Sequence, residues 1–517
     1  MRAPAGYPER RYPREHRRAG LEFLILGAGA LLVLGVIAAL TATRAGLPVL
    51  VAFLGVGMLL GSEGVGGIAF DDTELAQFVG IVGLVAILWE GGLTTAWRDV
   101  RGVLASSALL ATVGVVVTAA IVGGAAYMLF DLTLVEAMLL GAVVGSTDAA
   151  AVFATLRFTT LRRRVAGLLE AESGLNDPMA VALTVGLIAM ATGDGTGPAG
   201  VAGGVVWSLG VGLVAGLVLG EVAVRAVTRL PASFGPFAPV LSVGMACIAF
   251  GLPEAAGGSG FLAVYLVALR LGNTPNPFRR ALAAFHGGLA FIAQVSLFIV
   301  LGLLVFPSDL VDIAIPGLVL AAVLILVARP VAVWLCTVRP AMTGRERVVL
   351  SWAGLRGAVP IVLGTFVLSE GVGAGSTIFN AVFFVVLVST AVQGPLLEPL
   401  ARRLGLVDER AAVYEPPIEI GAVGGADILE FAVREGYSAA GALVRDLGLP
   451  RTALLAVVLR DGQAVPPRGR TRIEAGDRLY VLTRTNDLDE VSAVLDGWRE
   501  ATGPEPPPAG GGIAPGG

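Results

Sequence analysis

Cysteine and charged residues are scarce in this chain of 517 residues, and each scarcity excludes a class of protein. The two cysteines, Cys247 and Cys336, both lie in apolar segments. We interpret them as packing residues rather than as a disulfide or a metal-binding pair. Only 15% of the residues are charged, and the net charge of −4 is too small to indicate a nucleic-acid partner.

Three sequence signals are absent as well. No TVGYG-like segment is present, which a potassium channel would need for its selectivity filter. The stretch GAVGGAD at 421–427 lacks the G-x-G-x-x-G spacing of a dinucleotide site, so we expect no cofactor. No cleavable signal peptide is evident, because the apolar run after the Arg/Pro-rich tail at 1–20 is long enough to span a bilayer.

Apolar sequence is what the chain has in excess. Hydrophobic residues make up 55% of it, with a mean hydropathy of +0.81. Repeated apolar segments of roughly 20 residues predict an all-α polytopic membrane protein. The thirteen predicted helices cover residues 21–43, 47–61, 75–93, 102–130, 133–156, 165–192, 199–228, 236–253, 257–272, 283–306, 310–338, 347–369 and 376–399.

The loops between these helices alternate in charge. The loops after odd-numbered helices carry Arg44, Arg98, Arg101, Arg162, Arg163, Arg164, Arg225, Arg229, Arg279, Arg280, Arg345, Arg347, Arg402 and Arg403. The loops after even-numbered helices carry only acids, such as Asp71, Asp72, Asp131, Asp194, Glu254, Asp309 and Glu370. Positive loops stay in the cytoplasm, so we expect a cytoplasmic C-terminus and an N-terminus outside the cell membrane. The arginines of the N-terminal tail break this rule, and we follow the majority of the loops.

A small α/β domain is predicted at 413–498, after the transmembrane domain at 21–400. Alternating apolar runs there predict strands, and Asp461-Gly462 predicts a hairpin turn. The segment SAAGALVRDLG predicts a helix that ends at Gly448. The Pro/Gly-rich residues 503–517 show no pattern, and we expect them to be disordered.

One predicted helix carries a polar stripe. In the sequence AESGLNDPMA, Glu172 and Asn176 are four residues apart, as are Ser173 and Asp177. All four therefore lie on one face of a helix, and Pro178 favours a bend directly after them. Ionisable groups inside a span are costly and indicate function by default, although ion pairs that only hold helices together remain an alternative.

Two other predicted helices contain interruptions. The sequence GAVVGSTDAAA includes Asp148, and WAGLRGAVP includes Arg356 between two glycines. These helices are the fifth and the twelfth, so they cross the membrane in opposite directions. Matched broken helices in oppositely oriented halves are typical of an inverted-repeat secondary transporter. Asp148 and Arg356 would then offset the partial charges at the broken helix ends.

The motifs GSTDAAAVF, EAESGLNDPMAVALT, GSGFLAVYLVALRLGN and GLRGAVPIVL resemble the monovalent cation:proton antiporter-1 family of sodium/proton and potassium/proton exchangers. The resemblance covers about 21–400. In the tail, LVRDLGLP and AGDRLYVLT resemble the RCK-C (TrkA-C) module of potassium-transport regulators. The combination is similar to the potassium/proton antiporter branch. That branch often carries a further C-terminal domain, which we do not see here.

The resemblance implies a role for each polar residue of the stripe and the breaks. Asp177 would bind the cation or the proton, and Ser173, Thr147 and Glu90 would complete the cation shell. A structural cluster, made of a buried ion pair and an amide, would contain Glu172, Asn176 and Arg356.

The sequence leaves two interpretations open for each of three further residues. Glu90 lies near the cytoplasmic end of its helix, where interfacial solvation would also explain it. Arg329 would either pair with an acid or extend along the lipid. His286 would be a pH sensor or, as we favour, an interfacial histidine.

The resemblance implies an electroneutral exchanger, not an enzyme, that trades one K⁺ for one H⁺. A buried carboxylate holds a proton or a dehydrated cation but not both, and Asn176 supplies no second charge. A Na⁺(Li⁺)/H⁺ antiporter differs only in ion choice, and an organic-solute transporter or an RCK-regulated potassium channel are remoter alternatives. We also expect a homodimer, with a signalling nucleotide as a possible ligand of the tail.

Overall fold

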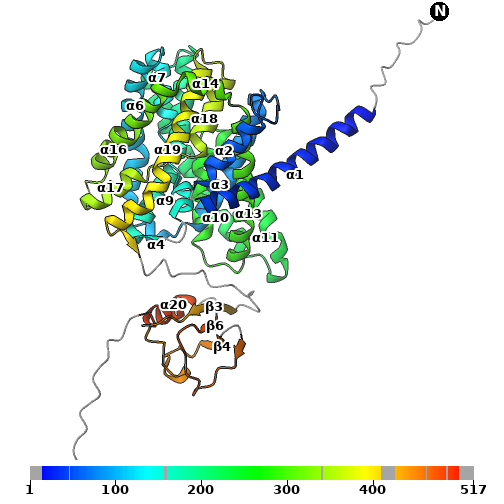
Figure 1. Cartoon of the computed structure of the whole chain (residues 1–517), viewed down its shortest axis with the longest axis vertical. Coiled ribbons are helices and arrows are strands. Elements are labelled where there is room, and N and C mark those ends of the chain that lie inside the picture. The colour runs from blue at the N-terminus through cyan, green and yellow to red at the C-terminus, as the bar shows by residue number, and fades with distance from the viewer. Residues whose placement is uncertain are drawn as a thin grey trace, which may run out of the picture. The chain divides into compact units, whose positions relative to one another are not determined.

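A computed structural model describes residues 14–45, 47–156, 160–338, 342–408, 426–460, 463–484 and 487–499. The chain divides into two compact units, Met1–Glu409 and Arg410–Gly517 (Figure 1). We call them the membrane unit and the tail unit. Most of the N-terminal tail and all of the Pro/Gly-rich end lie outside the described residues.

Helices make up nearly all of the described membrane unit. They are α1 (Arg14–Ala45), α2 (Val49–Leu60), α3 (Thr73–Thr94), α4 (Trp97–Val100), α5 (Leu104–Leu109), α6 (Val115–Leu129), α7 (Leu134–Val143), α8 (Ala149–Leu156), α9 (Arg163–Ala191), α10 (Pro198–Thr228), α11 (Ala238–Glu254), α12 (Gly260–Gly272), α13 (Arg279–Leu303), α14 (Pro307–Asp312), α15 (Ala314–Val323), α16 (Arg329–Cys336), α17 (Gly344–Trp352), α18 (Ala358–Ser369) and α19 (Gly375–Arg403). Within the described ranges, nine helical stretches are long and apolar enough to cross a membrane, and α2, α7, α12 and α18 are shorter apolar helices. The prediction of an all-α polytopic membrane domain is confirmed.

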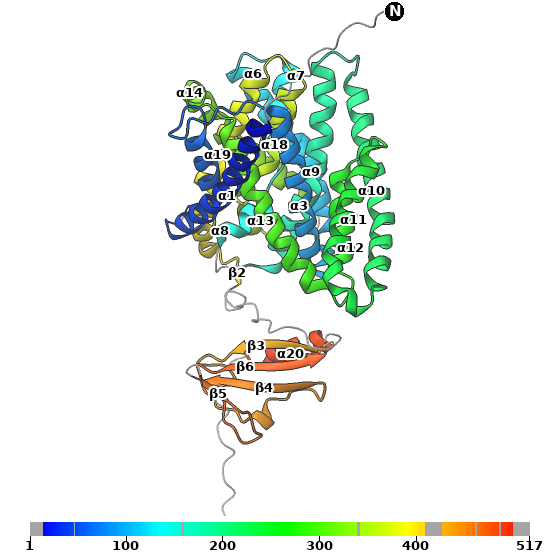
Figure 2. The ribbon, with the colours of Figure 1, turned by 90° about the vertical axis from the view of Figure 1, so that its right-hand side faces the viewer.

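Two helix pairs are broken where the sequence predicted interruptions. The chain leaves helical geometry at 144–148, between α7 and α8, and at 353–357, between α17 and α18. The two breaks lie against each other, because the backbone N–H of Asp148 donates to the carbonyl of Leu355 (2.9 Å). In Figure 2, α7 lies at the top of the unit and α8 lies below it, whereas in Figure 1 the second pair runs upward from α17 to α18. The two broken pairs therefore run in opposite directions.

A second matched pair of irregularities supports the inverted repeat. The fourth and eleventh predicted helices, again seven apart, each contain a π-helical turn, η1 (Leu110–Gly114) and η3 (Leu324–Ala328). Each turn packs against the helix of the other repeat, η1 on α16 and η3 on α6. Cys336 is buried beside η1, as a packing residue should be. Cys247 is instead exposed on α11, so its prediction as a packing residue is wrong.

Close helix packing in the unit depends on glycine. A Cβ atom at Gly141 of α7 would lie 2.2 Å from the carbonyl oxygen of Ala119 in α6, a contact that no side chain permits. At the α2–α13 contact, Gly57 and Gly302 face each other, and a Cβ on either would meet the opposite backbone. Small residues that let backbones approach are the usual basis of helix association in lipid, where burial of apolar surface adds little. Many large apolar side chains, such as Trp207 and Val214, stay exposed on the outer helices.

The tail unit is a four-stranded sheet with one described helix. Strands β3 (Ala426–Ala432), β6 (Arg478–Arg484), β4 (Ala453–Arg460) and β5 (Gln463–Val465) lie in that order, each antiparallel to its neighbour, beside α20 (Leu488–Gly497). The helix predicted at SAAGALVRDLG is wrong. Only a 3₁₀ turn at Val444–Asp446 forms there, because the N–H of Val444 bonds the carbonyl of Thr471. The predicted turn at Asp461-Gly462 lies outside the described residues, although β4 and β5 flank it as a pair.

One buried carboxylate anchors the tail sheet. Asp477 is 1% exposed, and its two oxygens accept hydrogen bonds from Nε and Nη2 of Arg460 (2.8 Å each). Burial alone would raise the pKa of Asp477. The hydrogen bonds from Arg460 and from the Glu474 backbone N–H, together with the guanidinium charge, outweigh burial and lower the pKa below its ordinary value.

Candidate functional site

A cavity of about 300 Å³ lies beside the two helix breaks. Its wall includes residues of α3, α8, α9, α12, α13 and α18 and of both breaks. All four residues predicted to bind the cation or proton line it: Asp177, Ser173, Thr147 and Glu90. The fold thus brings together side chains that are 87 residues apart in the sequence.

Asp177 is the more enclosed of the two carboxylates, Asp177 and Glu90, among these four residues. It is 7% exposed, and its Oδ1 atom has no hydrogen-bond partner among the residues that the structure describes. Its helix, α9, runs continuously through Pro178. Because proline has no backbone N–H, the carbonyl of Gly174, four residues earlier, loses its helical donor. Gly174 also lines the cavity.

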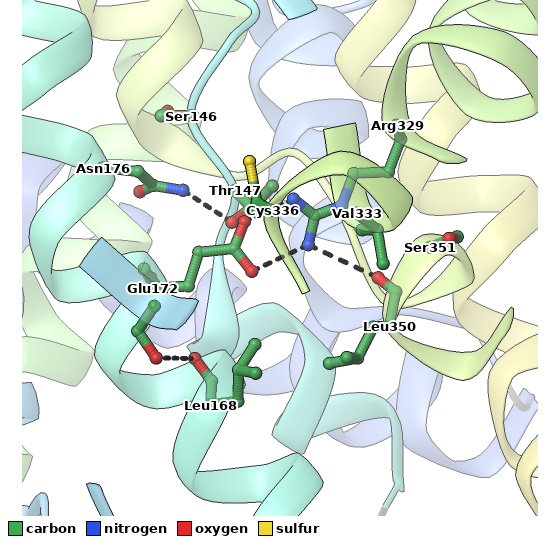
Figure 3. Close-up of polar contacts among 12 residues, drawn as sticks. Ser146, Thr147, Leu168, Glu172, Asn176, Arg329, Val333, Cys336, Leu350 and Ser351 are labelled. Atoms are coloured by element: carbon green, nitrogen blue, oxygen red, sulfur yellow. Dashed lines mark hydrogen bonds and ion pairs between the residues drawn. The ribbon is translucent and has the colours of Figure 1, made fainter. Parts of the chain in front are cut away.

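Hydrogen bonds hold the polar residues beside Asp177 in place. The Ser173 hydroxyl accepts a bond from the backbone N–H of Ala149 at the start of α8 (3.2 Å). The Asn176 amide donates to the Thr147 hydroxyl (2.7 Å), as Figure 3 shows. The polar stripe of α9 is therefore fixed against the first helix break, and the oxygens of Ser173 and Thr147 stay at the cavity wall.

Asp148 and Arg356 lie at the broken helix ends. The Asp148 carboxylate accepts a hydrogen bond from the N–H of Ala151 in the first turn of α8 (3.1 Å). Arg356 donates through Nη1 to the carbonyls of Gly145 (2.9 Å) and Ser146, which follow the end of α7. A negative group at a helix N-terminus and a positive group near a C-terminus each offset the helix dipole. This is the geometry that charge compensation requires.

The expected pairing of Glu172 with Arg356 is wrong. Glu172 forms a two-point ion pair with Arg329 of α16, in which Nη2 donates to Oε2 (2.8 Å) and Nη1 donates to Oε1 (Figure 3). Both side chains are buried, with 1% and 5% of their surfaces exposed. Arg329 therefore pairs with an acid and does not extend along the lipid. Arg356 is occupied by backbone carbonyls, which explains why it does not reach Glu172.

His286 is buried inside the protein, and its Nε2 lies 2.9 Å from the hydroxyl of Ser242, which also accepts a bond from Nε1 of Trp89 (3.1 Å). The three residues join α13, α11 and α3. Glu90, next to Trp89 in sequence, is only partly buried and lines the cavity instead.

Six polar residues of the cavity wall were not predicted from the sequence: Thr94, Thr95, Ser146, Glu170, Tyr265 and Gln294. A signal existed for Glu170, which precedes Asp177 by seven residues and so shares its helix face. Ser146 is adjacent to Thr147 in the predicted break. Tyr265 and Gln294 lie in otherwise apolar helices, and only the tertiary packing reveals them.

Crossed helix breaks around a buried carboxylate define the class of ion-coupled secondary transporters. The model of the family "Sodium/hydrogen exchanger, transmembrane" matches residues 29–403, and that of the TrkA-C domain matches residues 428–496. The chain belongs to the sodium/hydrogen exchanger family and carries a C-terminal TrkA-C domain.

Named relatives agree with this assignment. K(+)/H(+) antiporter NhaP2 of Shewanella baltica is 40% identical over 476 residues, which are 91% of this chain and 82% of that protein. K(+)/H(+) antiporter NhaP of Alkalimonas amylolytica is 36% identical over 480 residues, 92% of this chain and 83% of that protein. The structure of the sodium proton antiporter MjNhaP1 from Methanocaldococcus jannaschii at pH 8 has a TM-score of 0.67 at 25% identity. It covers 74% of this chain and 99% of its own.

Proposed function

We propose that this protein exchanges K⁺ for H⁺ across the cell membrane, one for one. The observation that carries the proposal is the carboxylate of Asp177, buried at the wall of a cavity with one oxygen unpartnered among the described residues. Similarity to proteins named K(+)/H(+) antiporters supports the choice of ions.

Exchange follows from the electrostatics of a single buried carboxylate. A charged and empty Asp177 is costly in a low-dielectric surrounding. The site therefore changes its access from one side of the membrane to the other only when Asp177 holds a proton or a cation. Its neighbour Asn176 is neutral and donates to Thr147, so it adds no second titrating charge. Each loaded form is therefore neutral, and the cycle carries no net current.

The oxygens of the cavity wall supply the remaining cation ligands. Ser173, Thr147 and Glu90 offer hydroxyl and carboxylate oxygens, which suit hard monovalent cations. Asp148, Glu172, Asn176 and Arg356 keep the ligands in position without holding the ion themselves. Asp148 and Arg356 bond the broken helix ends, whereas Glu172 bonds Arg329 and Asn176 bonds Thr147. Asp177 is therefore left to balance the transported charge.

The cavity reaches toward the arginine-rich end of the membrane unit. Thr94 and Thr95, which line it, directly precede α4 with Arg98, and Glu170 lies seven residues after Arg163. Arginine-rich loops stay in the cytoplasm, so this arrangement corresponds to a conformation open to the cytoplasm, with the N-terminus outside. Alternating access then requires the two inverted repeats to move against each other around the crossed breaks.

Sodium is the second candidate cation. The solved structure that matches the fold is titled a sodium proton antiporter, and hydroxyl and carboxylate ligands accept Na⁺ and K⁺ alike. We favour K⁺ because the relatives that match 91–92% of this chain are named for potassium. The TrkA-C domain also occurs in potassium systems, so it points the same way by association.

The tail unit regulates the exchanger rather than moving ions, in this proposal. The match of residues 428–496 to the TrkA-C domain supports this role, with a small signalling nucleotide as its ligand and a homodimer as the working form. Removing residues 413–517 should preserve exchange but shift the pH of half-maximal activity. Loss of the assembled protein after this truncation would contradict a purely regulatory tail.

The substitution Asp177→Asn tests the assignment of the ion-binding carboxylate. Purified protein in liposomes should lose cation-dependent proton movement, because an amide neither holds the proton nor balances the cation. The control Asp194→Asn removes the same charge from an exposed loop residue and should leave transport unchanged. Full exchange by the Asp177→Asn variant, with correct folding, would rule out the proposal.

A further inference from the structure

A second carboxylate faces the same cavity as Asp177. Glu170 lies on α9 seven residues before Asp177, two helical turns or about 10 Å along the axis. Ser173 and Gly174, between the two acids, also line the cavity. One face of α9 therefore forms a continuous wall from Glu170, nearer the arginine-rich end, to Asp177.

Glu170 is free to bind a cation. It is partly buried, and no hydrogen bond or ion pair of its side chain is recorded among the described residues. The nearby acid Asp99 acts on it electrostatically. Asp99 itself is paired with Arg163 (2.8 Å) and lies 3.8 Å from Arg98. Arg98 and Arg163 therefore contact Asp99, and neither is paired with Glu170.

A tyrosine hydroxyl belongs to the same cavity wall as this carboxylate. Tyr265 of α12 is 3% exposed and lines the cavity, and the negative charge of Glu170 acts on its phenol. Its phenolic oxygen makes no hydrogen bond of normal geometry within the described part of the chain, and the side chain of Thr95 lies near it. The ring packs on Gly174, where a Cβ would lie 2.3 Å from it. The Tyr265 ring therefore lies beside α9 at the level of Gly174, which is between Glu170 and Asp177 along the helix axis.

We propose that Glu170 and Tyr265 form an outer cation station, where a partly dehydrated monovalent cation binds before it reaches Asp177. The inference rests on the proposed exchange function and adds a site on its access path. A carboxylate and a phenol oxygen replace part of the hydration shell of the ion, and Glu170 raises the local cation concentration. The station tunes cation capture, whereas Asp177 alone carries the exchanged charge.

The test compares the cation dependence of exchange in proteoliposomes at constant ionic strength. Glu170→Gln should raise the apparent KM for K⁺ by about tenfold, the lower end of what a charged cleft contributes to local ion concentration. Its maximal rate should stay within about twofold of wild type, because chemistry at Asp177 is untouched. Glu170→Asp should restore most of the affinity. Tyr265→Phe, which keeps the ring on Gly174, should raise the KM by a smaller factor.

The control is Glu221→Gln on α10, which removes the same charge from a residue that does not line the cavity and should leave the KM unchanged. An unchanged KM in Glu170→Gln and Tyr265→Phe, with active wild-type protein, would overturn the outer station. A fall in maximal rate alone would overturn it too. Absence of exchange by the wild-type protein with every monovalent cation would instead refute the proposed function itself.

Discussion

The buried ion pair between Glu172 and Arg329 gives the sharpest stability prediction. Replacing Arg329 with Met keeps the length of the side chain but leaves the Glu172 carboxylate buried without its cation. Breaking a buried pair in this way costs about 3–5 kcal/mol. The value applies here because both groups are almost fully buried and share two hydrogen bonds.

The cost should appear as a lower melting temperature of the detergent-solubilised protein. A protein of this size loses roughly 1–2 °C per kcal/mol, since the shift falls with chain length, so we expect a drop of about 3–10 °C. The double variant Arg329→Met with Glu172→Gln removes the stranded charge and should recover at least half of the loss.

A matched control separates this effect from loss of any arginine. Arg270 on α12 pairs with Glu221, but these side chains are 54% and 39% exposed. Arg270→Met should therefore cost no more than about 1 kcal/mol. The reasoning is refuted if the melting temperature of Arg329→Met equals that of Arg270→Met. It is also refuted if the double variant is no more stable than Arg329→Met alone.

Two other substitutions test the helix crossing and the tail. Gly357→Ala would place a Cβ 1.7 Å from the Asp148 carboxylate. It should abolish exchange in proteoliposomes, while Gly244→Ala, with open space around it, should not. Asp477→Asn should cost the tail about 1.5–3 kcal/mol at pH 7, measured by hydrogen exchange of β6 in the full chain. Because the folded pKa of Asp477 is lowered, its contribution is complete above the unfolded pKa of ~4 and is lost as pH falls through the folded value. The difference between variant and wild type should therefore vanish at acidic pH, and a difference that persists there would contradict the ion-pair explanation.

Local spacing predicted the parts of the site that lie on one helix or in one break. The i, i+4 arrangement of Ser173 and Asp177 already places both on one face of α9, and the structure places both at the cavity. The glycines around Arg356 and the small polar residues before Asp148 marked the two helix breaks, which the structure contains at 144–148 and 353–357.

Contacts between distant helices could not be predicted in the same way. Glu172 and Arg329 are 157 residues apart, and nothing in the local pattern distinguishes Arg329 from Arg356 as the partner. Tyr265 gave no signal either, because a single hydroxyl in an apolar helix is compatible with lipid exposure as well as with a cavity. In the tail, the spacing of SAAGALVRDLG is typical of a helix, but its backbone instead forms hydrogen bonds with the segment at 471–473.

The central claim is electroneutral exchange of K⁺ for H⁺ at one carboxylate. The most direct test is proton movement in proteoliposomes with an imposed pH gradient, with K⁺, Na⁺, Li⁺ or Rb⁺ added outside and the membrane voltage varied separately. We predict a response to K⁺ that does not depend on voltage and is lost in Asp177→Asn. A response to Na⁺ and Li⁺ alone would contradict the choice of ion, and a voltage-dependent response would contradict the single-carboxylate mechanism.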